Sequence, residues 1–320
     1  MNFQSLKKIE DPDFYLDLAF GKAQDKAKAA RSTIKIKESR LDKSKHIELI
    51  KLDIIKEVLT DKLTLILESY PLLDDLPEFY NRLVMYTLDY DELKRALGAL
   101  KWVMDKLDGF NKIYKKKIRD TNHFEKVNSY RREFYGRVSS LLKQIKKQMR
   151  YMEEARRTMK SFPSVKTGKP TACLVGFPNV GKTTLLYKLT GSKPEIASYA
   201  FTTKGINVSY VKEKRIQLLD TPGTLNRPEK MNYIEMQAYL AIRTCADIII
   251  YVIDLTESYP VADQLKLLKQ MKAYKKPIYI YLSKTDILDK KVLKDFQEKH
   301  ETYDLPQIKK LLLDLSTKKE

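Results

Sequence analysis

The chain has 320 residues, a length that allows two domains with separate cores. Charged residues make up 32% of it and hydrophobic residues 43%, as in an ordinary water-soluble protein. The longest aliphatic or aromatic run, Ile248–Ile253, is too short to span a bilayer, and the N-terminus has no signal-peptide pattern. Two cysteines, Cys173 and Cys245, provide neither a disulfide framework nor a metal site. The composition therefore predicts a soluble protein located in the cytoplasm (the cytosol) and argues against a secreted or membrane-spanning protein.

The formal net charge of +19 is concentrated in one part of the chain. Residues 111–170 contain 18 Lys and Arg against 5 Asp and Glu. By comparison, residues 1–110 contain 19 against 20, and residues 171–320 contain 24 against 17. A compact basic surface attracts polyanions, chiefly nucleic acid, through phosphate contacts and counterion release. The charge pattern therefore favours a nucleic-acid-binding surface within residues 111–170.

The first half of the chain, residues 1–165, has the pattern of a helical domain. Its apolar residues recur at spacings of three and four, and one such face runs from Leu49 to Leu67 before Pro71 ends it. A bundle of four or five helices is the expected architecture. Residues 162–170 then supply the prolines, the glycine and the polar residues of a linker.

Helix boundaries are expected at several points in this half. Pro77 begins one helix, and Asp91 caps another that runs to about Leu107. Gly109 is expected to break the chain before a basic helix or helix pair over residues 111–160. Basic and aromatic side chains are interleaved there, which favours contact with structured RNA through its backbone. A solvated basic face and an anionic membrane surface are the alternatives.

After Pro170 the pattern changes to short apolar runs that alternate with helical stretches. Strands are expected at Thr171–Val175, Ile206–Val211, Ile216–Leu219, Asp247–Ile253, Pro277–Leu282 and Leu311–Leu315. Helices are expected at Lys182–Leu189, Tyr233–Thr244, Val261–Ala273 and Lys290–Lys299. Apolar strands joined by helical crossovers indicate a mostly parallel sheet flanked by helices.

Residues 176–183, Gly-Phe-Pro-Asn-Val-Gly-Lys-Thr, match the phosphate-binding loop Gly-x₄-Gly-Lys-Ser/Thr between a predicted strand and a predicted helix. The glycines permit a tight loop whose backbone N–H groups point at phosphate oxygens, and the helix N-terminus adds positive potential. Lys182 is expected to reach the β- and γ-phosphates and Thr183 to bind Mg²⁺. A glycine-rich turn with an exposed lysine is the alternative. The predicted nucleotide contacts of the loop are Gly176, Asn179, Val180, Gly181, Lys182, Thr183 and Thr184.

Two later segments are expected to respond to the γ-phosphate. A predicted strand ends in Asp-Thr-Pro-Gly, where Asp220 can hold Mg²⁺ through a water and the N–H of Gly223 can sense the γ-phosphate. In the loop of residues 194–205, Thr203 is expected to bind Mg²⁺ when GTP is present, with Thr202 as the second choice. The predicted metal ligands are thus Thr183, Thr203 and Asp220, and the predicted catalytic residues are Lys182, Thr203 and Gly223.

Residues 283–286, Ser-Lys-Thr-Asp, approximate the guanine-reading motif Asn-Lys-x-Asp. The Asp286 carboxylate can accept hydrogen bonds from the ring N–H and the exocyclic amine of guanine, a donor pair that adenine lacks. The Lys284 stem is expected to lie along the base. Ser283 stands in place of asparagine, so one hydrogen bond that steadies the loop is expected to be weaker or lost. A second guanine contact is expected from Ser316, Thr317 and Lys318, directly after the predicted strand Leu311–Leu315.

At these residues the sequence resembles the Obg-related GTPases, most closely the nucleolar GTP-binding protein 1 (Nog) family in a short, archaeal-type form. The stretches that carry the resemblance are Gly176–Leu186, Lys193–Val208 and Leu219–Pro228. The resemblance implies an all-α helical domain over residues 1–165, followed by an α/β P-loop GTPase domain over residues 171–320. It also implies a GTP-hydrolysing switch that uses GTP, GDP and Mg²⁺ in assembly of the large ribosomal subunit, with the helical domain on ribosomal RNA.

Several positions depart from the family pattern or qualify it. Thr224 stands where relatives usually carry leucine and small signalling GTPases a water-positioning glutamine, so intrinsic hydrolysis is expected to be slow. Asn179 matches an asparagine that binds K⁺ in several related GTPases, and a purely structural role in the loop is equally open. Ala200 replaces the proline usual before Phe201. Because the chain ends at Glu320, the closing helix of this fold is expected to be absent and the N-terminal bundle to cover one sheet face.

A GTPase that docks on RNA or ribosomal precursors is the leading hypothesis for function. Two others remain open: a nucleotide-stabilised RNA-binding scaffold with negligible turnover, and a translation or RNA-modification GTPase of the same superfamily. Phosphate release that no condition accelerates would favour the scaffold. A map of RNA–protein crosslinks would separate the leading hypothesis from the second alternative.

Overall fold

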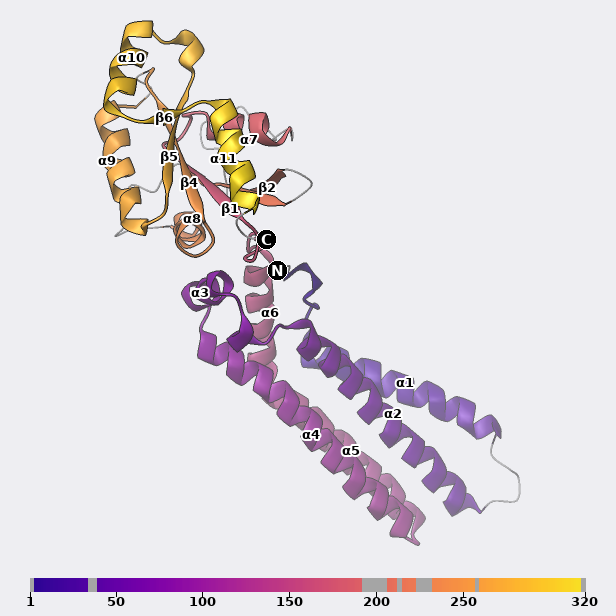
Figure 1. Ribbon diagram of the computed structural model, residues 1–320. Helices are drawn as coiled ribbons and strands as arrows, with labels where there is room; N and C mark the ends of the chain where they lie inside the picture. Colours follow the sequence, from indigo (N-terminus) through magenta and orange to yellow (C-terminus); the bar gives the residue numbers. More distant parts are fainter. Residues whose placement is uncertain are drawn as a thin grey trace. The chain divides into compact units, whose positions relative to one another are not determined.

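The computed structural model describes residues 3–33, 39–191, 206–211, 215–222, 232–256 and 259–317. Their contacts divide the chain into two compact units (Figure 1). The helical unit comprises residues 2–76 and 84–162, and the GTPase-type unit comprises residues 77–83 and 163–320. Among the described helices, none combines the length and apolar composition that crossing a bilayer requires.

The helical unit consists of long helices packed in antiparallel pairs (Figure 1). Helix α1 packs on α2, α2 on α4 and α5, and α4 on α5 and α6. Short 3₁₀ helices, η1 and η2, belong to the same unit, and α3 spans the division between the two units. The bounds are η1 Phe3–Ser5, α1 Pro12–Thr33, α2 Arg40–Ser69, η2 Leu73–Asp75, α3 Glu78–Thr87, α4 Tyr90–Asp120, α5 Phe124–Gln144 and α6 Lys146–Lys160.

Helix α4 begins earlier and ends later than the sequence predicted. Its N-cap is Asp89, whose side chain accepts a hydrogen bond from the Glu92 N–H at 2.9 Å, so the prediction of Asp91 as the cap was wrong. Gly109 does not break the helix, because buried residues continue on the same face on either side of it, from Leu107 to Tyr114. A glycine inside a helix costs only about 1 kcal/mol relative to alanine, which such packing outweighs.

The basic stretch 111–160 occupies the end of α4, all of α5 and all of α6. A break at Ile145, where φ is −96° and ψ is 13°, separates α5 from α6. The apolar stripe predicted as core is confirmed, since its members are all buried: Leu141, Leu142, Ile145, Met149 and Met152. The basic side chains are therefore distributed around helices whose apolar faces are already used in packing.

The GTPase-type unit is an α/β fold around a sheet with the strand order β2-β3-β1-β4-β5-β6. Strand β2 is antiparallel to β3, and the other neighbouring pairs are parallel. The strands are β1 Thr171–Val175, β2 Asn207–Val211, β3 Ile216–Asp220, β4 Ile248–Asp254, β5 Ile278–Ser283 and β6 Thr302–Tyr303. The helices are α7 Lys182–Thr190, α8 Tyr233–Thr244, α9 Val261–Met271, α10 Lys290–Lys299 and α11 Leu305–Thr317, with η4 Lys272–Tyr274 and η5 Thr285–Ile287.

Helices flank the sheet on both faces, with α7 and α11 on one side and α8 and α9 on the other (Figure 1). The three central strands, β1, β3 and β4, are buried along their whole lengths. Because these strands are parallel, their carboxyl ends meet at one edge of the sheet, which is where ligands bind in open α/β folds. The predicted fold class of the whole chain is confirmed.

The end of the chain differs from its prediction. Residues 311–315 are not a strand but part of helix α11, which packs against β3 and β5. A short apolar run is ambiguous between strand and helix, and here Ile308 and Leu312 are buried at helical spacing. The closing helix is therefore present, and α11 covers the sheet face that was expected to need the N-terminal bundle. Strand β6, with two residues, was too short to be predicted.

Candidate nucleotide-binding site

The segment 176–183 forms a tight loop between the end of β1 and the start of α7. Gly176 has φ +155° and Gly181 has φ +91°, values that residues with a Cβ rarely adopt. A Cβ on Gly176 would lie 2.5 Å from the carbonyl oxygen of Val252, so backbone from β4 passes too close for any side chain. Asn179 is also left-handed, at φ +59°. The loop geometry is therefore fixed by backbone requirements that the motif encodes.

Lys182, the first residue of α7, lies inside this loop rather than in solvent. Its side chain is buried, and Nζ donates hydrogen bonds to the carbonyl oxygens of Gly176 at 3.1 Å and Phe177 at 2.7 Å. Burial lowers the pKa of Lys182 to about 8, and the nearby Asp220 carboxylate opposes that shift. An ammonium group is thus held against the backbone of the loop, and the exposed lysine of the alternative reading is excluded.

Thr183 and Asp220 come together from α7 and the end of β3. The Thr183 hydroxyl donates to Oδ2 of Asp220 at 2.9 Å. Asp220 is fully buried, and its Oδ1 has no hydrogen-bond partner within the described parts of the chain. Burial raises the pKa of Asp220, while Lys182 and Thr183 act in the opposite direction. A buried carboxylate oxygen without a partner, beside a hydroxyl, fits a hard divalent cation such as Mg²⁺.

The segment 283–286 begins at the last residue of β5 and lies beside the phosphate loop. Ser283 is buried and donates from Oγ to the Ile253 carbonyl oxygen at 3.1 Å. Its Cβ is 3.3 Å from the position that a Cβ on Gly181 would take, which brings the two loops into direct apposition. Asp286 lies in η5 and is exposed. Ser283 thus tethers this segment to the neighbouring strand β4.

Lys284 has a partner that the sequence analysis missed. Its backbone is left-handed, with φ +52°, and Nζ donates to Oδ2 of Asp254 at 2.6 Å. Asp254 is buried at the end of β4. Desolvation raises the pKa of this carboxyl, but hydrogen bonds from Lys284 and Thr256 outweigh it, and the pKa is lowered overall. The signal was present in the sequence, as an aspartate directly after the apolar run Ile248–Ile253.

A buried glutamine fixes the position of Asp254. Gln264 of α9 donates from Nε2 to the Asp254 carbonyl oxygen at 2.7 Å and accepts from the Asp254 N–H at 3.0 Å. The main-chain carbonyl oxygen of Gln264 accepts a hydrogen bond from the Tyr251 hydroxyl at 2.6 Å. Lys284 is therefore anchored through Asp254 to the centre of the unit.

Two of the predicted base contacts do not follow a strand, because the run expected to be that strand is helical. Ser316 and Thr317 form the last turn of α11, where their hydroxyls donate to the carbonyl oxygens of Leu313 at 2.6 Å and Asp314 at 2.9 Å. The residue that follows the last strand is instead Asp304, which exchanges hydrogen bonds of 2.8 Å with Gln307.

Some predicted residues lie outside the described ranges, and the structure does not place them. They are Thr202, Thr203, Gly223, Thr224, Ala200 and Lys318.

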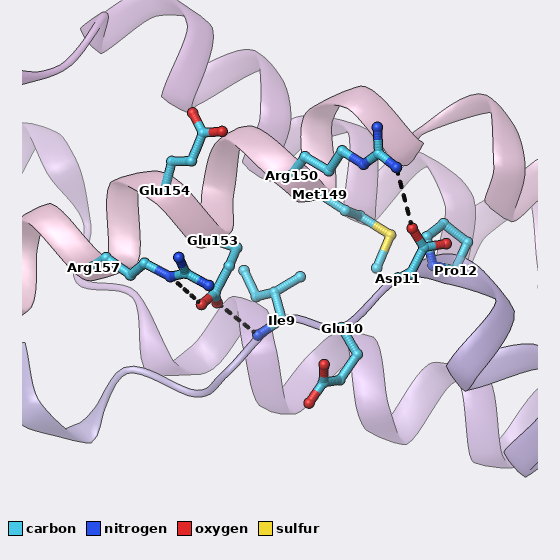
Figure 2. Close-up of a pocket in the computed structure, with 9 residues that line it drawn as sticks. All are labelled: Ile9, Glu10, Asp11, Pro12, Met149, Arg150, Glu153, Glu154 and Arg157. Carbon is cyan, nitrogen blue, oxygen red and sulfur yellow. Dashed lines mark hydrogen bonds and ion pairs between the residues drawn. The ribbon is translucent and has the colours of Figure 1, made fainter.

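The helical unit has a hollow between its N-terminal segment and α6 (Figure 2). Asp11 contacts Lys146 at 3.0 Å and Arg150 at 3.6 Å across it. Glu153 accepts from the Ile9 N–H at 3.0 Å and from Arg157 at 3.0 Å. Desolvation acts to raise the Glu153 pKa, but these hydrogen bonds and that of Arg156 lower it to about 2. Acidic groups therefore neutralise much of the positive charge on α6.

The cations of residues 111–144, on the end of α4 and on α5, divide into two groups. Some are paired with acids: Lys112 with Asp108, Lys115 with Asp53, Lys117 with Glu133, Arg131 with Glu48 and Lys143 with Asp13. Others are exposed and form no ion pair within the described parts of the chain: Lys116, Arg119, Lys126, Arg132 and Arg137. We call this second group the unpaired set.

Comparison with known families identifies both units. Residues 171–284 match the model of the 50S ribosome-binding GTPase family. Residues 3–166, about half of the chain, match the model of the NOG1 N-terminal helical domain. The chain belongs to the NOG1 family. The resemblance to the Nog family in the motifs is thereby confirmed, and the helical unit of this NOG1-family protein is identified by its own match.

Individual relatives agree with this assignment. An uncharacterised protein of Methanocaldococcus jannaschii is 40% identical over 256 residues, which cover 79% of this chain and 72% of that protein. Nucleolar GTP-binding protein 1 of Caenorhabditis elegans is 29% identical over 98% of this chain and 45% of its own length. The Drosophila melanogaster protein of the same name is 29% identical over 90% and 44%. This NOG1-family chain thus spans less than half the length of these nucleolar relatives.

Two solved structures are similar to about half of the chain. A variant of Aquifex aeolicus Era bound to GDP·AlF₄⁻ is 28% identical, with a TM-score of 0.35, over 46% of this chain and 56% of that one. The FeoB G-domain from Methanococcus jannaschii is 17% identical, with a TM-score of 0.35, over 47% and 98%.

Proposed function

We propose that this protein is a cytoplasmic GTP-hydrolysing switch that acts in assembly of the large ribosomal subunit and binds ribosomal RNA through its helical unit. One observation carries the proposal: Lys182, Thr183 and Asp220 converge at the carboxyl ends of β1 and β3 in a chain whose other half matches the NOG1 helical domain. That convergence supplies a phosphate ligand and a cation site. The family membership supplies the ribosomal context.

The residues of the site have distinct roles in this proposal. The loop N–H groups and Lys182 bind the β- and γ-phosphates, and Thr183 and Asp220 hold Mg²⁺, which neutralises phosphate charge when bound. Asp286 reads guanine, and Asp254 orients Lys284 beside the base. Thr203 and Gly223 complete the γ-phosphate response. Asn179 is the candidate K⁺ ligand, and the absence of a glutamine at position 224 keeps unassisted hydrolysis slow.

The test combines turnover with association. Single-turnover phosphate release should be slow for the protein alone and accelerate with large-subunit precursor particles, in K⁺ more than in Na⁺. The native protein should sediment with those particles. If turnover stays negligible under every condition, the protein is a nucleotide-stabilised scaffold and not a switch. If it sediments with mature ribosomes alone, the proposed role in assembly is wrong.

The Lys182 pKa of about 8 predicts that GTP affinity depends on pH. Adjacent phosphates favour the ammonium form, so binding must take up a proton wherever the free lysine is already deprotonated. Affinity should therefore be nearly constant below about pH 7.5 and fall by up to about tenfold per unit above about pH 8. Calorimetry on either side of this pKa measures the effect. Lys182→Arg retains its charge throughout and is the control for titration of the guanine itself; equal pH slopes for both proteins would contradict the prediction.

RNA binding is assigned to the unpaired set because many of the other cations of residues 111–160 already have carboxylate partners. An ion-paired lysine must give up its partner before it can neutralise a phosphate, whereas an exposed, unpaired one only releases solvent and counterions. Basic helices bind RNA mainly through the phosphate backbone. The unpaired set therefore forms the expected docking surface, and α6 contributes less than its composition suggests.

Neutralising three unpaired cations should weaken RNA binding far more than neutralising three paired ones. We compare Lys116→Gln/Lys126→Gln/Arg137→Gln with Lys143→Gln/Arg150→Gln/Arg157→Gln, which change the net charge equally. The first variant should lose at least about tenfold in affinity for large-subunit ribosomal RNA at about 100 mM salt. Its log–log salt slope should decrease by about 2 to 3, at roughly 0.7 to 0.9 per phosphate contact. Equal losses in the two variants, measured by fluorescence anisotropy, would show that overall charge alone determines binding.

A further inference from the structure

Helix α4 carries the only tryptophan of the sequence, and it carries it on the solvent side. The residues that α4 buries recur at helical spacing along one face, from Leu93 to Ile118. At 3.6 residues per turn, position 102 falls on the opposite face of the helix. Trp102 is accordingly 41% exposed, whereas Val103, the next residue, is fully buried. The indole therefore takes little part in the core of the helical unit.

Cations surround Trp102 on this side of α4. Arg95 lies two turns before it and Lys106 one turn after it, at spacings that keep side chains on one face of a helix. Lys101 flanks the indole on its other side. All three are exposed and form no ion pair within the described parts of the chain. From position 95 to position 106 the sole acid is Asp105, so positive charge is in excess. We call Arg95, Lys101, Trp102 and Lys106 the Trp102 face.

The approach to the indole is open on one side. Side chains of a helix lean toward its N-terminus, so the residue beside an indole at position 102 is the one a turn earlier, Gly98. A Cβ placed on Gly98 would meet no heavy atom within 4 Å, and this includes the atoms of Trp102 itself. No side chain at position 98 therefore covers the ring, and a planar group can reach it from that turn.

A nucleic acid fits this face better than a protein does. Ile113 is also exposed on the solvent side of α4, but it lies 11 residues after Trp102, roughly 16 Å along the helix axis. Lys106 stands between them. The two apolar side chains thus form no continuous patch of the kind that the core of a protein interface needs. A single aromatic ring among unpaired cations is instead typical of proteins that bind single-stranded RNA, where bases stack on rings and cations contact phosphates.

We propose that Trp102 stacks on an unpaired base of RNA, while Arg95, Lys101 and Lys106 contact the phosphates next to that base. The inference rests on the RNA-binding function proposed above. A base inside a duplex has both of its faces covered by neighbouring pairs, so only a loop, a bulge or an end can offer one to the indole. The unpaired set contacts the phosphate backbone, and the Trp102 face adds a site for a single-stranded segment of the same RNA.

The emission of the only tryptophan reports directly on this contact. A base stacked on an indole quenches its fluorescence. The probe is oligoadenylate of roughly 12 nucleotides, within the usual span of single-strand sites, and the comparison is a fully paired RNA duplex of equal length. Anisotropy of a label on each RNA shows when the full chain is saturated. At saturation oligoadenylate should quench the emission strongly and the duplex should quench it little, with Trp102→Phe supplying the background without tryptophan.

Variants measure how much the stacked base contributes. Trp102→Ala should bind in vitro transcribed large-subunit ribosomal RNA roughly 5- to 100-fold more weakly, the range expected for one lost base stack. Its log–log salt slope should equal that of the wild type, because no cation has been removed. Trp102→Phe keeps a stacking ring and should recover most of the affinity. The matched control is Phe14→Ala, which removes an exposed aromatic side chain from α1 and should bind like the wild type.

Three results would overturn the inference. Oligoadenylate could bind without quenching Trp102. Trp102→Ala could bind ribosomal RNA as tightly as Phe14→Ala does. The emission could respond to RNA-free proteins of the large subunit and not to RNA, which would assign the face to a protein partner. If instead the wild type binds no RNA at all, the proposed function itself fails. If the triple variant of the unpaired set loses affinity and Trp102→Ala does not, only the stacking inference fails.

Discussion

Replacing Lys182 with alanine should reduce the affinity for GTP by more than about 100-fold. The side chain is buried within the phosphate loop, where Nζ already lies at hydrogen-bonding distance from two carbonyl oxygens. Charge-assisted hydrogen bonds contribute about 1.5 to 3 kcal/mol each, and two lost contacts to the β- and γ-phosphates exceed the roughly 2.8 kcal/mol that 100-fold requires. Calorimetry with GTP and Mg²⁺ measures the loss.

Two further variants separate this effect from a folding defect. Lys188→Ala removes an exposed lysine from the same helix and should bind GTP like the wild type. Lys182→Met preserves the buried volume without a charge, so it should lose affinity as Lys182→Ala does. Its thermal unfolding midpoint should not fall, because a desolvated ammonium group has been removed. GTP affinity close to wild type in Lys182→Met would refute the assignment of the loop.

The phosphate loop could be predicted because its geometry depends on the backbone. Gly176 and Gly181 have positive φ values that residues with a side chain rarely adopt, and Gly176 also lies too close to the Val252 carbonyl oxygen for any Cβ. A loop of this shape therefore needs glycine at these two positions. Buried parallel strands were predicted for a similar reason, since each is a short apolar run between turn residues. The positions of β1, α8 and α10 were predicted to the residue. Local chemistry alone determines all of these features.

The errors occurred where tertiary packing decides the outcome. The apolar run Leu311–Leu315 is as compatible with a strand as with a helix. It is part of helix α11 in the structure, where it packs on β3 and β5. In the same way, Gly109 lies inside α4 because the helix buries residues on both sides of it. A single sequence shows the apolar residues but not the surface that receives them. The expectation that Ser316 and Thr317 follow a strand failed as a consequence.

Contacts between residues distant in the sequence also could not be predicted from the sequence alone. Asp254 and Lys284 are 30 positions apart, and Gln217 and Lys166 are 51 apart, so no local motif joins them. The sequence shows the positive charge of residues 111–160 but not which of these cations are ion-paired. Their acidic partners Asp11, Asp13 and Asp53 lie far away in the sequence, on the N-terminal segment, α1 and α2. The structure therefore narrows a predicted basic surface to a few unpaired side chains.

Asp286→Asn should change the base preference of the site from guanine to xanthine. Asp286 is exposed in η5, three residues after Ser283, which lies against Gly181 of the phosphate loop. A carboxylate there can accept both N–H groups of guanine. Asparagine replaces one acceptor with an amide N–H, which faces the guanine amine unfavourably but donates well to the xanthine carbonyl. We expect the affinity of Asp286→Asn for GTP to fall at least about 100-fold, because two charge-assisted hydrogen bonds to guanine are disrupted. The affinity of this variant for XTP should exceed its affinity for GTP.

The matched control is Asp289→Asn, three positions further along the chain. Asp289 caps α10 by accepting from the Lys291 N–H at 2.8 Å, a role that asparagine fulfils equally well. This variant should therefore retain both its stability and its preference for GTP. Competition binding of GTP, XTP and ATP to the two variants and the wild type decides the matter. Unchanged GTP preference in Asp286→Asn would place the base outside the loop after β5, because no other carboxylate in residues 283–286 could take over the role of Asp286.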